Sequence, residues 1–225
     1  MSNRADQIAS GALESARART PFAAPVAAAV KKTEVRHGSS GPLTWGETVA
    51  RIRADRKRLL AVLAAQPGAA TKAAFFHPSF ICVLLYRISS HLFRSRHYLA
   101  ARIFWQLSFV ITGADISPAA ELGEGLLILS PAGAALMGVA GRNLTVMPCA
   151  GMGGEMGNLE DIGAGPGLPL LQDDVVLEPH AGILGPIRVG SRVRVRAGLV
   201  LTKDAPDDAD IVGPEHRFIG PKNAL

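Results

Sequence analysis

The sequence predicts an α+β fold in which an N-terminal α-helical region is followed by a parallel β-helix. Two observations carry this prediction. The second half of the chain repeats apolar residues every six positions, and the first half contains segments with the wide apolar faces of packed helices. The composition agrees, because 48% of the residues are hydrophobic but only 5% are aromatic, which suits a core of small aliphatic side chains.

The six-residue repeat is uninterrupted from residue 171 onward. Its corner residues there are Leu171, Leu177, Ile183, Val189, Val195 and Leu201. The same period occurs earlier, at Ile116, Leu122, Ile128, Ala134, Ala140 and Val146. A period of six fits neither an amphipathic helix nor a half-buried strand. It is typical of a coil with three short flat faces, whose corner residues point inward and stack on those of the neighbouring coils.

The two runs of repeats are out of register with each other. Val146 and Leu171 are 25 residues apart, one more than a multiple of six. Part of the chain between them must therefore leave the coil. The Gly-rich stretch at about 152–170 is predicted to form this extruded loop, a common location for functional residues.

The first half predicts three helices. Thr44 and Glu47 fit a capping box that begins a helix ending at about Ala65. Two more helical segments follow, at about 79–95 and 98–111. Residues 1–43 have no sustained apolar period, so we expect a flexible basic tail, either passive or docking onto a partner. The expected division is a disordered tail (1–43), an α-helical region (44–113) and a β-helix (114–225).

The charge is distributed unevenly along the chain. Residues 1–114 carry 16 Lys and Arg against 5 Asp and Glu, whereas residues 115–225 carry 8 against 14. The basic residues lack aromatic interleaving or a binding motif, so nucleic acid is not an expected partner. Two cysteines give neither a disulfide framework nor zinc-ligand spacing. Without a secretory signal or an apolar stretch of about 18 residues, we expect a soluble cytoplasmic protein with no metal and no transmembrane segment.

Three stretches of the chain resemble the serine acetyltransferases, which are hexapeptide-repeat enzymes. They are His77–His91, Ala114–Gly125 and Ile211–Gly220. The resemblance implies a left-handed β-helix, a homotrimer with active sites between subunits, and transfer of an acetyl group from acetyl-CoA to the hydroxyl of serine, a step of cysteine biosynthesis.

The resemblance also locates the catalytic positions. The base of the family, a histidine, falls on Ser130, and the aspartate before it falls on Leu129. The carboxylate that orients the base is retained as Asp115. A basic run that helps to hold the substrate corresponds to residues 167–170, which are Gly-Leu-Pro-Leu. His180 is a candidate replacement base, or else an interface or solvent-facing residue.

In such enzymes the pantetheine arm of acyl-CoA lies between subunits against the backbone of small residues. By resemblance, the positions that would bind it are Gly153, Gly154, Ala181, Arg194 and Ala197. Arg192, Arg194 and Arg196 alternate along one predicted strand. They would either reach the phosphates of CoA or form a solvated outer face.

Two functions follow from these observations. The first is an acetyl-CoA-dependent O-acetyltransferase related to serine acetyltransferase, either degenerate or with a changed hydroxyl or amine acceptor. The second is a non-catalytic β-helical scaffold or regulatory homologue that binds partner proteins through its basic tail and helices. The retained Asp115 favours the first, and Leu129 and Ser130 favour the second.

Overall fold

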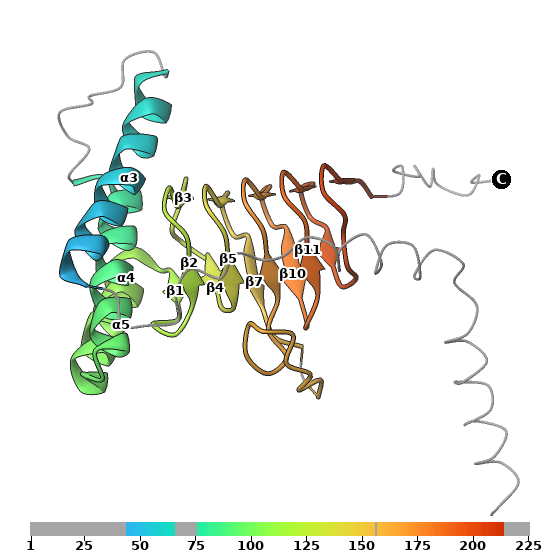
Figure 1. The fold of residues 1–225 in the computed structure, drawn as a ribbon. Coiled ribbons are helices and arrows are strands. Elements are labelled where there is room, and N and C mark those ends of the chain that lie inside the picture. The colour runs from blue at the N-terminus through green and yellow to red at the C-terminus, as the bar shows by residue number, and fades with distance from the viewer. Residues whose placement is uncertain (1–43, 66–75, 156, 214–225) are drawn as a thin grey trace, which may run out of the picture.

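A computed structural model describes residues 44–65, 76–155 and 157–213 of the 225-residue chain. Three helices lie together at one end of a stack of coils (Figure 1). They are α3 (Trp45–Ala64), α4 (Pro78–Arg94) and α5 (Tyr98–Thr112). The tail predicted at 1–43 and the last part of the predicted β-helix, 214–225, lie outside the described residues.

The helix ends follow from local sequence. The predicted capping box is confirmed, because the Thr44 hydroxyl accepts a hydrogen bond from the Glu47 amide and the Glu47 carboxylate accepts one from the Thr44 amide at 2.8 Å. At the start of α4, His77 Nδ1 accepts a hydrogen bond from the Ser79 amide. Helix α5 ends at Gly113, whose φ of +72° is the left-handed C-cap conformation that favours glycine.

The strands form three parallel sheets, one on each face of the coil. Face A contains β1 (Asp115–Ile116), β4 (Ala135–Leu136), β7 (Gly151–Gly153), β10 (Gly182–Leu184) and β13 (Val200–Leu201). Face B contains β2 (Glu121–Leu122), β5 (Val139–Ala140), β8 (Leu170–Leu171) and β11 (Arg188–Val189). Face C contains β3 (Leu127–Ile128), β6 (Thr145–Val146), β9 (Val176–Leu177), β12 (Arg194–Val195) and β14 (Asp210–Ile211). The predicted parallel β-helix is therefore confirmed.

The interior of the coils is filled by the repeated aliphatic residues. Many of the inward residues are at most 1% exposed, among them Leu122, Ile128, Val146, Leu177, Ile183, Val189 and Val195. Each stacks on its counterpart in the next coil, as the pairing of Ile128 with Val146 and of Val146 with Leu177 shows. The same core continues into α4 through Cys82, Val83 and Tyr86, so the helices and the coils share one hydrophobic interior.

The register of the second coil differs from the prediction. Leu136, and not Ala134, pairs with Ile116 and points inward. Ala134 is also buried, but it lies in the turn before β4, and Ala132 is exposed. Leu136 follows Ile128 by eight residues and precedes Ala140 by four, instead of six in each case. The two segments together still span twelve residues, so the repeat is back in register at Ala140. The regular spacing on either side hid this local shift.

The chain leaves the coil between β7 and β8, within the region predicted to form a loop. Val146 pairs with Leu177, 31 residues further on, whereas Leu177 pairs with Val195 after only 18. The additional residues protrude from the side of the stack (Figure 1). Within the loop the Asp161 carboxylate accepts hydrogen bonds from the amides of Gly163 and Gly165.

Helices α3 and α4 satisfy the open end of the β-helix. Backbone N–H groups of one coil donate to carbonyls of the following coil, as the amides of Asp115, Gly123 and Leu127 do. Carbonyls of the first coil that point away from the second coil therefore have no backbone donor. Side chains of the helices donate to them instead: Tyr86 to Ala120, Arg87 to Leu122 and Gly123, Arg58 to Gly125, and Ser79 to Leu129, at 2.6 to 3.2 Å. We call this set of contacts the helical cap.

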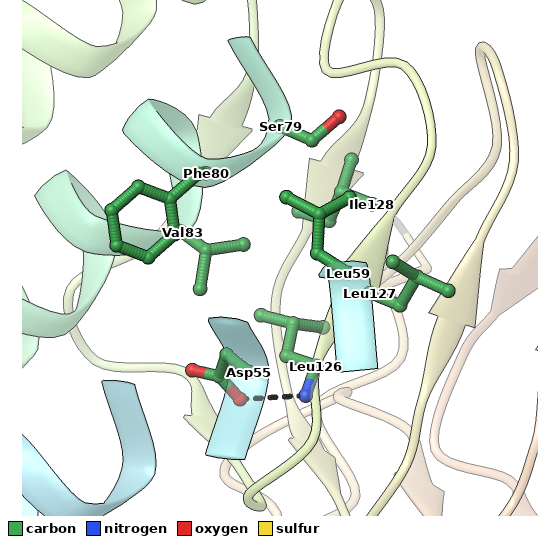
Figure 2. Close-up of a pocket in the computed structure, with 8 residues that line it drawn as sticks. All are labelled: Asp55, Leu59, Ser79, Phe80, Val83, Leu126, Leu127 and Ile128. Atoms are coloured by element: carbon green, nitrogen blue, oxygen red, sulfur yellow. Dashed lines mark hydrogen bonds between the residues drawn. The ribbon is translucent and has the colours of Figure 1, made fainter. Parts of the chain in front are cut away.

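A buried ion pair lies at the centre of the helical cap. Arg87 Nε donates to Asp55 Oδ2 at 2.9 Å, and the two side chains are only 3% and 2% exposed. Asp55 Oδ1 accepts a hydrogen bond from the Leu126 amide at 2.8 Å, as Figure 2 shows. The small cavity beside the pair is lined mainly by apolar residues of α3, α4 and the first coil, and has room for about one water molecule.

Replacement of Arg87 should strongly destabilise the protein. Arg87→Gln leaves the buried Asp55 carboxylate without its counter-charge and the Leu122 and Gly123 carbonyls without their donor. We expect a loss of about 3–5 kcal/mol in the free energy of unfolding, measured by guanidinium denaturation. Arg142→Gln is the matched control, because its pair with Asp173 is exposed and is worth about 0–1 kcal/mol. Equal losses would contradict the role of the buried pair.

The shifted register can be tested by two neighbouring substitutions. Leu136→Ala opens a cavity in the interior of the coil and should reduce the free energy of unfolding by about 2–5 kcal/mol. Met137→Ala alters a side chain that is 38% exposed and should change it by no more than about 0.5 kcal/mol. If the two variants had the same stability, Leu136 would not be the inward residue.

Candidate functional site

The candidate site residues gather at one edge of the β-helix. The turns that connect face C to face A stack on one another at residues 129–134, 147–150, 178–181 and 196–199, and we call this edge the C/A corner. Backbone hydrogen bonds join successive turns, from the His180 amide to the Pro148 carbonyl and from the Gly198 amide to the Pro179 carbonyl. Ser130, His180, Ala181 and Ala197 all lie at this corner.

The positions of the expected base and its neighbour are tied to the helical cap. Ser130 is half-buried at the start of the first turn of the C/A corner. Leu129 packs against the apolar cluster of Leu59, Phe80 and Leu127, and its carbonyl accepts a hydrogen bond from the Ser79 hydroxyl at 3.2 Å. An apolar side chain at 129 therefore stabilises the contact between the helices and the first coil.

Asp115 is held by a residue that the sequence did not single out. It lies on β1, the first strand of face A, and its Oδ1 accepts a hydrogen bond from Trp105 Nε1 of α5 at 2.9 Å. The guanidinium of Arg102 lies 5.8 Å from the centre of the Trp105 ring. The carboxylate expected to orient a histidine thus has an indole N–H as its partner.

His180 is exposed, but the structure does not bring it to Ser130. Its turn lies two coils further along the axis than that of Ser130, which separates their levels by about 10 Å within one chain. Cys149 occupies the equivalent position in the turn between them, and its thiol points toward the Ala132 carbonyl, 3.8 Å away. Both residues have a left-handed backbone, with φ of +61° for His180 and +57° for Cys149.

Arg192, Arg194 and Arg196, which were expected to alternate along one strand, do not all lie on that strand. Arg194 and Arg196 flank Val195 on face C, but Arg192 lies in the preceding turn with a φ of +59°. Each guanidinium is paired with a carboxylate: Arg192 with Asp208, Arg194 with Glu178, and Arg196 with both Glu178 and Asp210. The arginines therefore form an ion-paired outer face.

Glu178 links three of the groups at this corner. Its carboxylate accepts hydrogen bonds from Arg194 at 3.1 Å, from Arg196 at 3.3 Å and from the Ala197 amide at 3.2 Å. The hydrogen bond from Arg194, and then that from the Ala197 amide, hold the pKa of Glu178 below its ordinary value. The sequence could not single out Glu178, because its partners lie 16 to 19 residues away and meet it only when the coils stack.

One outward row of face A consists mostly of small residues, although Met137, beside β4, and Leu184, on β10, are 38% and 41% exposed next to it. Successive strands place Asp115, Ala135, Gly151, Gly182 and Val200 side by side as outward residues. Gly153 and Gly154 lie where the chain passes from face A into the loop, and a methyl group on Gly153 would contact nothing within 4 Å. An extended ligand could therefore approach the backbone closely along this strip.

Three further titratable residues, His91, Asp173 and Asp174, have structural partners. His91 Nδ1 lies 3.1 Å from the Thr48 hydroxyl, and the His91 ring packs edge-on against Trp45. Asp173 and Asp174 lie in a turn, where they accept hydrogen bonds from Arg142 and Asn143, respectively. Within residues 44–65, 76–155 and 157–213, no group of three or more His, Cys, Asp or Glu is placed to hold a metal ion.

Comparison with known proteins decides the family. No protein-family model matches the chain. A serine acetyltransferase of Helicobacter pylori is 32% identical over 162 residues, which cover 70% of this chain and 92% of that protein. The chain belongs to the serine acetyltransferase family. A relative from Synechococcus elongatus is 30% identical over 64% of this chain, which spans only 57% of that protein's length.

Solved structures of this family share the fold. A serine acetyltransferase of Neisseria gonorrhoeae, solved with serine, matches with a TM-score of 0.64 and 25% identity over 75% of this chain and 68% of its own. A serine acetyltransferase solved with CoA matches with a TM-score of 0.62 and 20% identity over 72% of this chain and 66% of its own, and this likeness concerns the fold alone. The predicted left-handed β-helix behind N-terminal helices is confirmed.

The two cysteines should differ sharply in reactivity. Burial raises the pKa of Cys82 to about 11, so roughly a thousandth of it is thiolate at about pH 8, whereas Cys149 is exposed. We expect one thiol to react rapidly with a disulfide reagent in the folded protein and both to react after denaturation. Cys149→Ser should abolish the rapid reaction. Two rapidly reacting thiols in the folded protein would contradict the buried position of Cys82.

Proposed function

We propose that this member of the serine acetyltransferase family is an acyl-CoA-dependent acyltransferase whose acceptor is an amine or a hydroxyl other than that of free serine. The observation that carries the proposal is the row of small outward residues Ala135, Gly151 and Gly182 on face A, with Asp115 at one end and Gly153 and Gly154 at the edge of its third strand. Small outward residues would leave room for an extended thioester arm, and the Asp115 carboxylate lies in the same row.

The replaced residues argue for a changed acceptor. In acyl transfer, the acceptor oxygen or nitrogen attacks the thioester carbonyl, the CoA thiolate leaves, and a base removes the acceptor's proton. A serine hydroxyl needs that base during the attack, and the Ser130 hydroxyl cannot serve near neutral pH. A neutral amine attacks with its own lone pair and loses its proton afterwards. His180, exposed at the C/A corner, is the imidazole that we propose for this proton.

We also propose a homotrimer in which the acyl-CoA cleft lies between subunits. The coil has flat faces, and the small outward residues of face A would allow a neighbouring subunit to approach its backbone closely. The three-part division of the chain, the cytoplasmic location and a partner for residues 1–43 stay predictions.

A non-catalytic scaffold is the second candidate, and specific contacts favour it. Arg194, proposed to reach CoA, is paired with Glu178, and the Ala197 amide donates to the same carboxylate. Both groups would have to exchange a partner within the protein for one on the ligand. Leu129 serves packing instead of acid/base chemistry.

Calorimetric titration with acetyl-CoA, followed by a thiol-release assay, separates the two candidates. Acyltransferase function predicts saturable binding, CoA release with a panel of small amines and hydroxyl compounds, and at most slow release with serine. The absence of acetyl-CoA binding would exclude the acyltransferase.

Light scattering on the same sample should give the mass of a trimer, and a monomer would contradict the cleft between subunits.

Ser130→His provides a second arm of this experiment. A base restored at this position should raise thiol release with serine by about 10²-fold or more if the cleft is otherwise intact. Ser130→Ala is the matched control and should bind acetyl-CoA like the unmodified protein. Leu129→Asp is unsuitable as a first test, because it places a carboxylate against the apolar cluster of the helical cap.

A further inference from the structure

Helix α5 exposes an apolar face that its packing leaves uncovered. Its other side contacts α4 and β1. The exposed face carries a row of large apolar residues with helical spacing: Leu99, Ile103, Leu107 and Val110, which are 76%, 56%, 42% and 80% exposed. Tyr98, Phe109 and Ile111, each more than half exposed, extend the row at its margins. Apolar residues gathered in this way on one helix indicate an interaction surface.

The surroundings of this face are positively charged. The sequence contains no Asp or Glu between Arg56 and Ala114. Arg96 and His97 are exposed at the start of α5, and Arg102 is exposed within it. The nearest acidic residues along the following chain already have partners, because Asp115 accepts a hydrogen bond from Trp105 and Glu121 pairs with Arg94 at 3.2 Å. Among the residues that the structure describes, no ion pair that neutralises Arg96 or Arg102 is found.

We propose that this face of α5 docks onto an anionic lipid bilayer, with the helix lying parallel to the membrane surface. An apolar row flanked by arginines, with aromatic rings at its margins, is the pattern of helices that bind at the interface between lipid headgroups and acyl chains. None of the helices in the described part of the chain is long and apolar enough to cross a membrane.

Charge favours lipid over the α5 helix of a second copy of the chain as the occupant. Two copies meeting through α5 would bring Arg96 and Arg102 of each against a surface with the same charge and no acid from residues 56–114 to pair with. Anionic headgroups supply the missing counter-charges. This inference does not depend on the proposed acyltransferase activity, since it concerns residues of α5 and its start alone.

Flotation of the full chain with vesicles tests the proposal. Vesicles of two parts phosphatidylcholine to one part phosphatidylglycerol should bind the protein, and vesicles of pure phosphatidylcholine should bind it more weakly. Added salt should reduce the difference in affinity between the two types of vesicle. The double substitution Leu99→Ser, Val110→Ser should weaken binding at least tenfold. Arg96→Gln and Arg102→Gln should each weaken binding to the anionic vesicles by roughly fivefold. Leu159→Ser, which alters a side chain of similar exposure in the loop, is the matched control.

Three outcomes would overturn the proposal. The first is that the protein binds neither type of vesicle. The second is that the Leu99→Ser, Val110→Ser variant binds vesicles as tightly as the unmodified protein. The third is that this variant forms a smaller oligomer in light scattering but still binds vesicles. The second outcome would assign lipid binding to another part of the chain, and the third would assign α5 to contact between subunits. Circular dichroism of the variant should match that of the unmodified protein, because the substituted side chains are exposed.

Discussion

The end of a β-helix leaves strand carbonyls without the neighbouring coil that would supply their donors, and the rest of this structure depends on how that end is closed. Here the donors are side chains of two helices, arranged around the buried pair of Asp55 and Arg87. Burial lowers the pKa of Arg51 and of Arg58, which also donate to first-coil carbonyls, so these charges lie in a poorly solvated setting. Part of the basic character of the first half of the chain thus serves hydrogen bonding to the backbone.

The helical cap and the candidate site share residues, which links stability to chemistry. Leu129 packs under the helices and Ser130 follows it directly into the C/A corner. A carboxylate at 129 would have to be desolvated in that apolar cluster, at a substantial energetic cost. An aspartate at 129 would therefore disturb the contact between the helices and the first coil, whereas a histidine at 130 would leave the packing of Leu129 in place.

Local signals predicted most of the fold, whereas contacts between coils escaped prediction. The capping box at Thr44, the six-residue repeat and the register change that requires a loop are all visible within short windows of sequence. The inward position of Leu136 was missed because the eight-residue and four-residue segments around it preserve the overall period. The site was less predictable still. Trp105 and Glu178 acquire their roles only through partners brought together by the packing of α5 on β1 and of one coil on the next.

The backbone of the C/A corner bears on how His180 should be interpreted. A left-handed residue other than glycine is often a sign of strain at a functional site. Here Gly133, Cys149, His180 and Gly198 occupy equivalent places in successive turns, and all have positive φ. The corner between faces B and C repeats the pattern with Gly125, Asn143, Asp174, Arg192 and Asp208. The coil itself therefore imposes this conformation, and the backbone of His180 carries no information about catalysis. The case for His180 as a base therefore rests on the exposure of its imidazole at the C/A corner and not on its backbone.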